Sequence, residues 1–247
     1  MRVLKGALLV FAVVTTAAAQ SPEPPLADTR LTVHTLLRED VFAGFLDNNM
    51  ERFAKAEQNI DALMKARPEQ RANLMAWKAG TSLYRAVLAH ESGNPAEFAR
   101  FYAETCDGFA AAAKLSSGND GVTAITGGSY AMFADRLPLE HRAAAWSQAY
   151  DSYSMLWQAQ SAQVEQLPLH FKGELLAGMA QSAQRTGRNK ESSQFVDKML
   201  TLLSNTPFEK TAQQWKSDPA SAATTSLTCK NCHNAGRLSA RLAALNK

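Results

Sequence analysis

The chain has 247 residues, 46% of them hydrophobic and 20% charged, which is typical of a globular protein with one or two domains and a sizeable core. The formal net charge of +3 includes two basic residues within the first nineteen positions. Without them, 24 basic residues stand against 23 acidic ones, so the charge gives no reason to expect nucleic acid as a partner.

The first nineteen residues have the pattern of a secretory signal peptide. Two basic residues precede an apolar run over 7–14, and small residues then lead to an A-x-A cleavage site that contains Ala17 and Ala19. An uncleaved N-terminal anchor is the alternative, although the apolar run is short for a membrane span. We therefore expect residues 1–19 to be a signal peptide and the mature chain to be periplasmic.

The rest of the chain is expected to be helical. Residues 20–35 are rich in proline and polar residues, which indicates a flexible lead-in. From 36 to 217, apolar residues recur at helical spacing and no segment has the alternation of a strand, so the sequence predicts an all-α domain. The expected helices are two that meet near 47–49, one that stops at Gly93, and others over 95–114, 119–135, 139–166, 169–187, 190–205 and 208–217. Gly127 and Gly128 are expected to interrupt the helix over 119–135.

Long helices joined by short loops favour antiparallel hairpins. The run "WKAGTSLY" resembles the W-x-x-L-G-x-x-Y pattern of a tetratricopeptide repeat (TPR), with Trp77, Gly80 and Tyr84 near the expected places. Leucine is missing from its position, and Tyr84 stands one residue late. The resemblance implies TPR-like hairpins stacked as a solenoid across 36–217, and an irregular helical bundle is the alternative.

Residues 218–247 are expected to form a linker followed by a helix with a cofactor motif. Cys229, Cys232 and His233 form a C-x-x-C-H sequence, which in an exported protein indicates covalently bound haem c. On a helical turn, positions i, i+3 and i+4 share one face, so the three side chains would point the same way. The thiols would form thioethers with the haem vinyl groups, and the imidazole would be the proximal iron ligand.

Three other uses of this motif fit less well. A zinc site needs four ligands, and no second Cys/His pair stands elsewhere in the sequence. A thioredoxin-like redox pair requires a strand before a helix, which the helical pattern does not provide. A disulfide between Cys229 and Cys232 would leave His233 without a role.

Residues 229–233 resemble the attachment motif of the c-type cytochromes. Only fourteen residues follow His233, and none is Met or His, unlike small cytochromes c with a downstream Met ligand. A motif near the C-terminus with Arg237 four residues after the histidine resembles the cytochrome c prime class, which implies a four-helix bundle. That bundle would use the helices over 139–166, 169–187, 190–205 and 228–245. The resemblance implies a monohaem c-type cytochrome.

The second iron ligand would come from the helical body or from a partner, unless that position is open. The candidates are His34, His90, His141, His170, Met50, Met64, Met75, Met132, Met155, Met179 and Met199. The sequences "LPLEH" and "LPLH" place His141 and His170 in the first turn of a helix, where the helix dipole favours the neutral imidazole that metals bind. We rank His170 first, then His141, then Met179. The alternative for each is a structural role at a helix start or in the core.

The last helix has an apolar stripe and a basic face. Leu238, Leu242 and Leu245 follow helical spacing, which predicts that the helix packs on the body or on the haem. Arg237 and Arg241 would pair with haem propionates or attract an acidic redox partner, and the alternative is that they complement the helix dipole.

Two further features are expected to be structural. Trp146, Tyr150, Tyr153 and Trp157 lie on one helix face, which favours core packing over a haem pocket or a partner groove. Cys106 is expected to be buried, with an intermolecular disulfide as the alternative.

The first functional hypothesis is electron transfer by an exported monohaem cytochrome docked to a larger redox protein or membrane-bound complex. The second is a TPR-like interaction module with accessory haem. The third is a haem-based sensor or peroxidase-like protein with an open iron site, and the first hypothesis implies an electron carrier rather than an enzyme.

Overall fold

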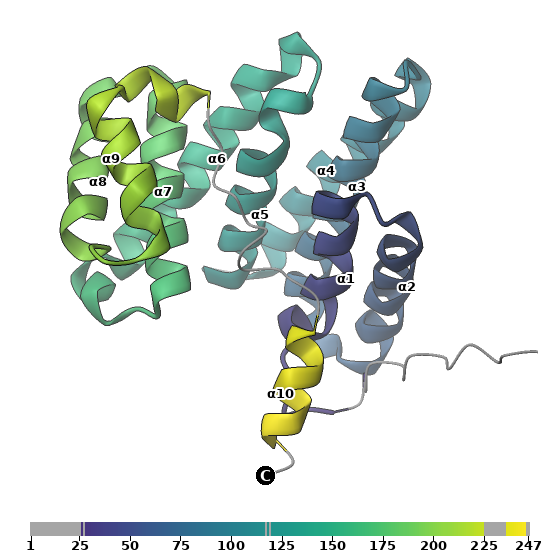
Figure 1. Cartoon of the computed structure of the whole chain (residues 1–247). Coiled ribbons are helices and arrows are strands. Elements are labelled where there is room, and N and C mark those ends of the chain that lie inside the picture. Colours follow the sequence, from purple (N-terminus) through teal and green to yellow (C-terminus); the bar gives the residue numbers. More distant parts are fainter. Residues whose placement is uncertain (1–25, 27, 117, 119, 225–235, 246–247) are drawn as a thin grey trace, which may run out of the picture.

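The computed structural model describes residues 26, 28–116, 118, 120–224 and 236–245, and within these ranges the protein is all-α, as the sequence predicts. The helices pack as successive antiparallel pairs (Figure 1). The first two pairs are α1 (Val33–Asp47) with α2 (Met50–Ala66) and α3 (Arg71–Glu91) with α4 (Pro95–Ser116). The next two are α5 (Asp120–Phe133) with α6 (Leu139–Gln160) and α7 (Leu169–Arg185) with α8 (Asn189–Leu202). Helix α9 (Pro207–Ser217) packs on α8, and α10 (Arg237–Leu245) packs on α1.

Two of the tight turns share one geometry. Gly93 and Gly187 adopt left-handed backbone angles, with φ of 72° and 76°. In each turn the residue after the glycine donates its N–H to a carbonyl five positions back, at 2.8 Å, which ends the preceding helix and reverses the chain. These glycines allow the short connections that the hairpins require.

The side chains form two hydrophobic clusters. The first lies among α1 to α6 and includes contacts between the rings of Phe45, Tyr84 and Phe133 at centroid distances of 4.8 to 5.3 Å. The second lies among α6 to α9 and includes Tyr153 and Trp215. No helix among the described residues is both long and apolar enough to cross a membrane.

The expected aromatic stripe on α6 packs against α7 and α8. Trp146 and Tyr153 are buried, and Trp157 meets Phe195 edge-on at 5.0 Å. The Tyr150 hydroxyl donates to Glu191 at 2.8 Å. The stripe therefore has the structural role that its helical spacing favoured.

Several local expectations were wrong. Helix α5 runs through Gly127 and Gly128 without interruption. The two glycines allow other helices to approach closely, since a Cβ at Gly127 would lie 3.0 Å from the Ser152 Cβ. Helix α1 begins at Val33, inside the segment 20–35 that was expected to be flexible. Cys106 is exposed, although we expected it to be buried.

The ends of the helical domain also differ from expectation. Residues Pro219–Ala223 form a 3-10 helix that packs on α7 and α9, so the helical domain extends into the segment expected to be a linker. Arg185 donates to the Ala222 carbonyl there. Helix α10 packs on α1 and not as a fourth helix beside α6, α7 and α8, so the bundle implied by the cytochrome c prime resemblance does not form among the described residues.

Candidate functional site: a basic histidine cluster beside the last helix

Helix α10 is held against the start of the helical body. The backbone N–H groups of Gly236 and Leu238 donate to the two carboxylate oxygens of Glu39 on α1, each at 2.9 Å. At its other end, the Arg30 guanidinium donates to the Leu245 carbonyl at 3.3 Å. The expected leucine stripe of Leu238, Leu242 and Leu245 packs on the first hydrophobic cluster. The attachment of α10 to the body is therefore both polar and apolar.

Two histidines from distant parts of the chain lie near this docked helix. His34 is in the first turn of α1, and its ring lies 5.2 Å from the Trp77 ring, centroid to centroid. Burial lowers the pKa of His34 to about 4, and the charge of Arg38 and that of His170 in its protonated form add to this effect. Burial also lowers the pKa of His170 on α7, together with Arg237 and Arg38. Both imidazoles are therefore neutral at neutral pH, which is the form that binds metal ions.

Electrostatic interactions thus link five residues of α1, α7 and α10, which we call the basic histidine cluster. Its members are His34, Arg38, His170, Arg237 and Arg241. Burial lowers the pKa of Arg38, and so do the neighbouring charges of Arg237 and Arg241. None of these three guanidiniums forms an ion pair with a carboxylate of the described residues. The cluster therefore favours an anionic group.

The nearest carboxylate does not neutralise the cluster. Burial alone would raise the pKa of Glu39, but the N–H groups of α10 and the Arg52 guanidinium outweigh burial and lower it. Arg52 lies 3.2 Å from Glu39 and 2.6 Å from Asp40. Glu39 thus holds α10 and Arg52, and its charge also acts to raise the pKa of Arg38, but burial and the neighbouring guanidiniums outweigh it.

A second carboxyl group lies next to His170. Glu174 follows His170 by one turn, and its Oε2 lies 3.5 Å from the His170 Nε2. Burial raises the pKa of Glu174 to about 7, although 34% of its side chain is exposed. Gly128 on α5 makes room for it, because a Cβ there would lie 3.2 Å from the Glu174 Oε1. At neutral pH this carboxyl group is partly protonated and can either donate or accept a hydrogen bond.

The wall beside His34 contains an unsatisfied donor. Trp77 is only 4% exposed, and its indole N–H has no hydrogen-bond partner among the described residues. The side-chain oxygen of Asn73, one turn earlier on α3, also has none. Buried polar groups are nearly always paired, so the Trp77 N–H is a donor that a water molecule or another polar group could pair with.

The chain was compared with protein-family models, curated proteins and solved structures. None of the three comparisons finds a match. Within the described ranges, no group of three or more His, Cys, Asp or Glu side chains is arranged to hold a metal ion.

The structure separates the three ranked candidates for the second iron ligand. His170 lies in the basic histidine cluster. His141 lies between α4 and α6, where its ring is 4.5 Å from Tyr102 and 5.1 Å from Phe98, centroid to centroid. Met179 is buried in the second hydrophobic cluster, with its sulfur 3.9 Å from the Ser154 hydroxyl. Of the three, His170 alone is placed beside the residues that follow the motif.

The motif residues Cys229, Cys232 and His233 lie outside the described residues, whereas Arg237 and Arg241 lie within them. His34 was among the candidates for the second iron ligand, but it was not one of the three that were ranked. The one local signal was the spacing of His34 and Arg38, four residues apart and so on one helix face. Its neighbours on α7 and α10 are far away in sequence, and no local pattern reveals them.

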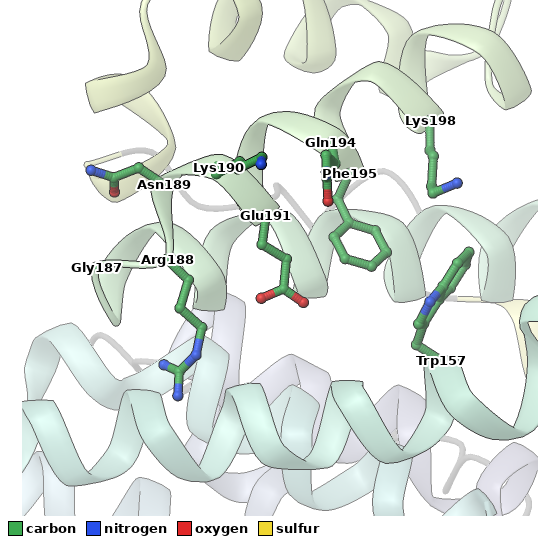
Figure 2. Close-up of a pocket in the computed structure, with 9 residues that line it drawn as sticks. All are labelled: Trp157, Gly187, Arg188, Asn189, Lys190, Glu191, Gln194, Phe195 and Lys198. Carbon is green, nitrogen blue, oxygen red and sulfur yellow. The ribbon is translucent and has the colours of Figure 1, made fainter.

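A separate cavity of about 680 Å³ lies on α6 and α8 (Figure 2). Trp157, Phe195 and Lys198 line one end, with the Lys198 ammonium 5.4 Å from the Trp157 ring. Arg188 and Glu191 line the other end, where both contact Tyr150. None of the lining residues comes from α1 or α10. This cavity is therefore not part of the basic histidine cluster.

Proposed function

We propose that the chain is an exported monohaem c-type cytochrome that transfers electrons while docked to a larger redox partner. Cys229 and Cys232 would hold the haem covalently, and His233 would be the proximal iron ligand. His170 would be the second axial ligand. When bound, haem c supplies a one-electron couple that the polypeptide lacks.

The observation that carries the proposal is the docking of α10 beside two neutral histidines. Gly236 is three residues after His233, so their Cα atoms are at most about 11 Å apart. The Gly236 N–H donates a hydrogen bond to Glu39 on α1, which is five residues after His34 and next to Arg38. This short connection supports a haem position at the basic histidine cluster.

The chemistry of the cluster suits a haem group. His34 and His170 are imidazoles whose lowered pKa values favour the neutral form that binds metal ions. Arg38, Arg237 and Arg241 would offer positive charge for propionate carboxylates, with Glu39 the one carboxylate among the described residues that acts on Arg38. The unpaired Trp77 N–H offers one more donor at the same site. An imidazole on the second axial position would close the iron to small molecules, which favours electron transfer over sensing or peroxide chemistry.

Covalent haem is the first requirement of the proposal. The full-length chain would be produced in a bacterium that carries out cytochrome c maturation. The purified protein is expected to keep its haem absorbance after denaturation, and the variant with Cys229→Ser and Cys232→Ser is expected to lose it. A folded wild-type protein without covalent haem would contradict the proposal.

The state of the iron then tests electron transfer against the sensor or peroxidase alternative. A low-spin spectrum that carbon monoxide does not change is expected for a six-coordinate electron carrier. A high-spin, five-coordinate spectrum would contradict this part of the proposal and favour an open iron site.

A further inference from the structure

The cavity on α6 and α8 is lined by side chains of one helix face. Four residues of the segment 188–198 recur at intervals of three and four positions, which places them on the same side of α8. They are Arg188, Glu191, Phe195 and Lys198, and Figure 2 shows that they project toward α6. The volume of about 680 Å³ is in the range of ligand-binding sites.

The basic side chains of the cavity lie against aromatic rings and not against carboxylates. The Arg188 guanidinium lies 4.0 Å from the centre of the Tyr150 ring, and the Lys198 ammonium lies 5.4 Å from the centre of the Trp157 ring. Neither these two cations nor Lys190 forms an ion pair with a carboxylate of the described residues. A cation that lies over a ring is partly ordered but keeps its charge, so it can still bind an anion.

The acidic side chains near the cavity do not balance these cations. Glu191 is the one acidic residue of the lining, and its Oε2 accepts a hydrogen bond from the Tyr150 hydroxyl at 2.8 Å. Asp197, next to Lys198 in the sequence, pairs with Lys216 at 2.6 Å. Three basic residues therefore line the cavity against one acidic residue, which favours an anionic ligand.

The aromatic end of the cavity adds an apolar surface. Trp157 is partly exposed, and its ring meets that of Phe195 edge-on at 5.0 Å, centroid to centroid. Phe195 is buried in the second hydrophobic cluster, so the Trp157 ring is anchored on the core. An apolar side chain that packs on Trp157 would remove more of this ring from water. It would also strengthen the attraction between Lys198 and a carboxylate, because it excludes water from that end.

The length of the cavity favours a peptide over a small anion. Arg188 and Lys198 are ten residues apart, which corresponds to about 15 Å along a helix. An extended peptide covers this distance with about five residues, at roughly 3.3 Å per residue. A single small carboxylate would reach one end and leave the cation at the other end without a partner.

We propose that this cavity binds an extended acidic segment of another protein, with carboxylates at Arg188 and Lys198 and an apolar side chain against the Trp157 ring. The site does not include the C-x-x-C-H motif. The inference therefore goes beyond the proposed function and does not depend on haem.

The probe for this site is a fluorescently labelled peptide with a central phenylalanine and three acidic residues on each side. Its fluorescence anisotropy is measured during titration with the purified full-length chain. Wild type is expected to bind it saturably. The variant with Arg188→Gln and Lys198→Gln is expected to bind at least about tenfold more weakly, because two charge contacts are lost.

The matched control is the variant with Lys65→Gln on α2 and Lys114→Gln on α4. It has the same net charge as the cavity variant, and all four substituted side chains are exposed, so both variants are expected to fold. The control is expected to bind the peptide as tightly as wild type. The absence of saturable binding to wild type, or equal affinities of the two variants, would overturn the proposal.

Two further probes test the apolar contact and the size of the ligand. A peptide with alanine in place of the central phenylalanine is expected to bind about fivefold more weakly, and equal affinity would overturn the role of Trp157. Phenylacetate, a small aromatic carboxylate, is expected not to displace the peptide when the two are at equal concentration. Displacement under that condition would identify a small-molecule site and overturn the proposal.

Sedimentation of the chain without peptide tests a second copy as the occupant. Wild type and the variant with Arg188→Gln and Lys198→Gln are expected to have the same oligomeric state. Self-association of wild type that these substitutions abolish would show that a second copy occupies the cavity, and the proposal would be wrong.

Discussion

The protein contains two pairs of histidines whose surroundings differ sharply. In the basic histidine cluster, His34 and His170 lie beside guanidiniums of α1 and α10. On another face, His90 and His141 lie beside the stacked rings of Phe98 and Tyr102, and we call these four residues the aromatic histidine cluster. The partner helices, and not the local sequence, decide whether a histidine lies among guanidiniums or among aromatic rings. His141 and His170 begin their helices in nearly the same sequence, yet only His170 meets the helix that follows the motif.

The largest expected effect is on the iron ligands. In the haem-loaded protein, His170→Ala is expected to turn the low-spin spectrum into a high-spin one that responds to carbon monoxide, because it removes the proposed second ligand. His141→Ala and His90→Ala are the matched controls and are expected to leave the absorption spectrum unchanged. If His34→Ala changes the spectrum and His170→Ala does not, His34 is the ligand. A change in His141→Ala alone would contradict the comparison.

The aromatic histidine cluster is expected to contribute to stability and not to the iron. Phe98→Ala removes a buried ring that contacts Tyr102, His90 and His141, and we expect a loss of about 3 kcal/mol in the free energy of unfolding. Denaturant unfolding measures this loss, and the absorption spectrum of the haem-loaded variant is expected to stay as in wild type. A spectral change as large as that of His170→Ala would remove the distinction between the two clusters.

The helices themselves could be predicted from the sequence because their signals are local. The turn glycines Gly93 and Gly187, and helical periodicity, predicted most helix ends to within a few residues. The same local rule failed at Gly127 and Gly128, where glycine serves close packing between helices and does not break one. Cys106 was misjudged because its exposure depends on how α4 packs and not on its apolar neighbours.

The candidate site could be predicted only in part. Arg237 and the leucine stripe indicated a packed basic helix, and the ranking of His170 relied on its place at a helix start. The electrostatic interactions that link His170 to His34 and Arg237 join residues of α1, α7 and α10, which are far apart in sequence. Such contacts depend on side chains along several helices at once, and a single periodic pattern contains no record of the pairing.

The pH dependence of folding offers a smaller contrast between the clusters. The pKa of His34 is about 4 in the folded protein against 6.5 for an ordinary histidine, so the unfolded chain binds a proton more readily between these values. The contribution of His34 to the free energy of unfolding is therefore constant above pH 6.5. It falls by about 2 to 3 kcal/mol as the pH decreases to 4. Below pH 4 the imidazole is protonated in both states and the loss is complete.

Glu174 acts in the opposite sense. Its pKa of about 7 lies above the usual value, so the folded protein holds that proton more tightly and loses stability as the pH rises from 4.5 to 7. The difference in the free energy of unfolding between wild type and His34→Phe separates the contribution of His34 from that of Glu174. Both proteins would be measured in the haem-free background with Cys229→Ser and Cys232→Ser. We expect this difference to change between pH 4 and 6.5, and no such change for His141→Phe. A difference that is independent of pH would contradict the burial of the His34 imidazole.

The smallest expected effect concerns Arg38, and its sign depends on the cofactor. In the haem-free protein, Arg38→Gln removes repulsion from Arg237 and Arg241, so the free energy of unfolding is expected to rise by less than about 1 kcal/mol. In the haem-loaded protein, the same change removes a cation that would attract propionates, and the free energy of unfolding is expected to fall.

Arg100→Gln on α4, beside the aromatic histidine cluster, is the control for Arg38→Gln. Arg100 already pairs with Glu97 and Glu104, each at 2.7 Å, so its loss is expected to have the same small effect with and without haem. Chemical denaturation of both variants in both forms gives the comparison. If Arg38→Gln changes the free energy of unfolding in the same direction with and without haem, the positive charge of the cluster does not serve an anionic group of the cofactor. A reversal of sign confined to Arg38 would mean that the cluster remains unbalanced until the cofactor brings its own negative charge.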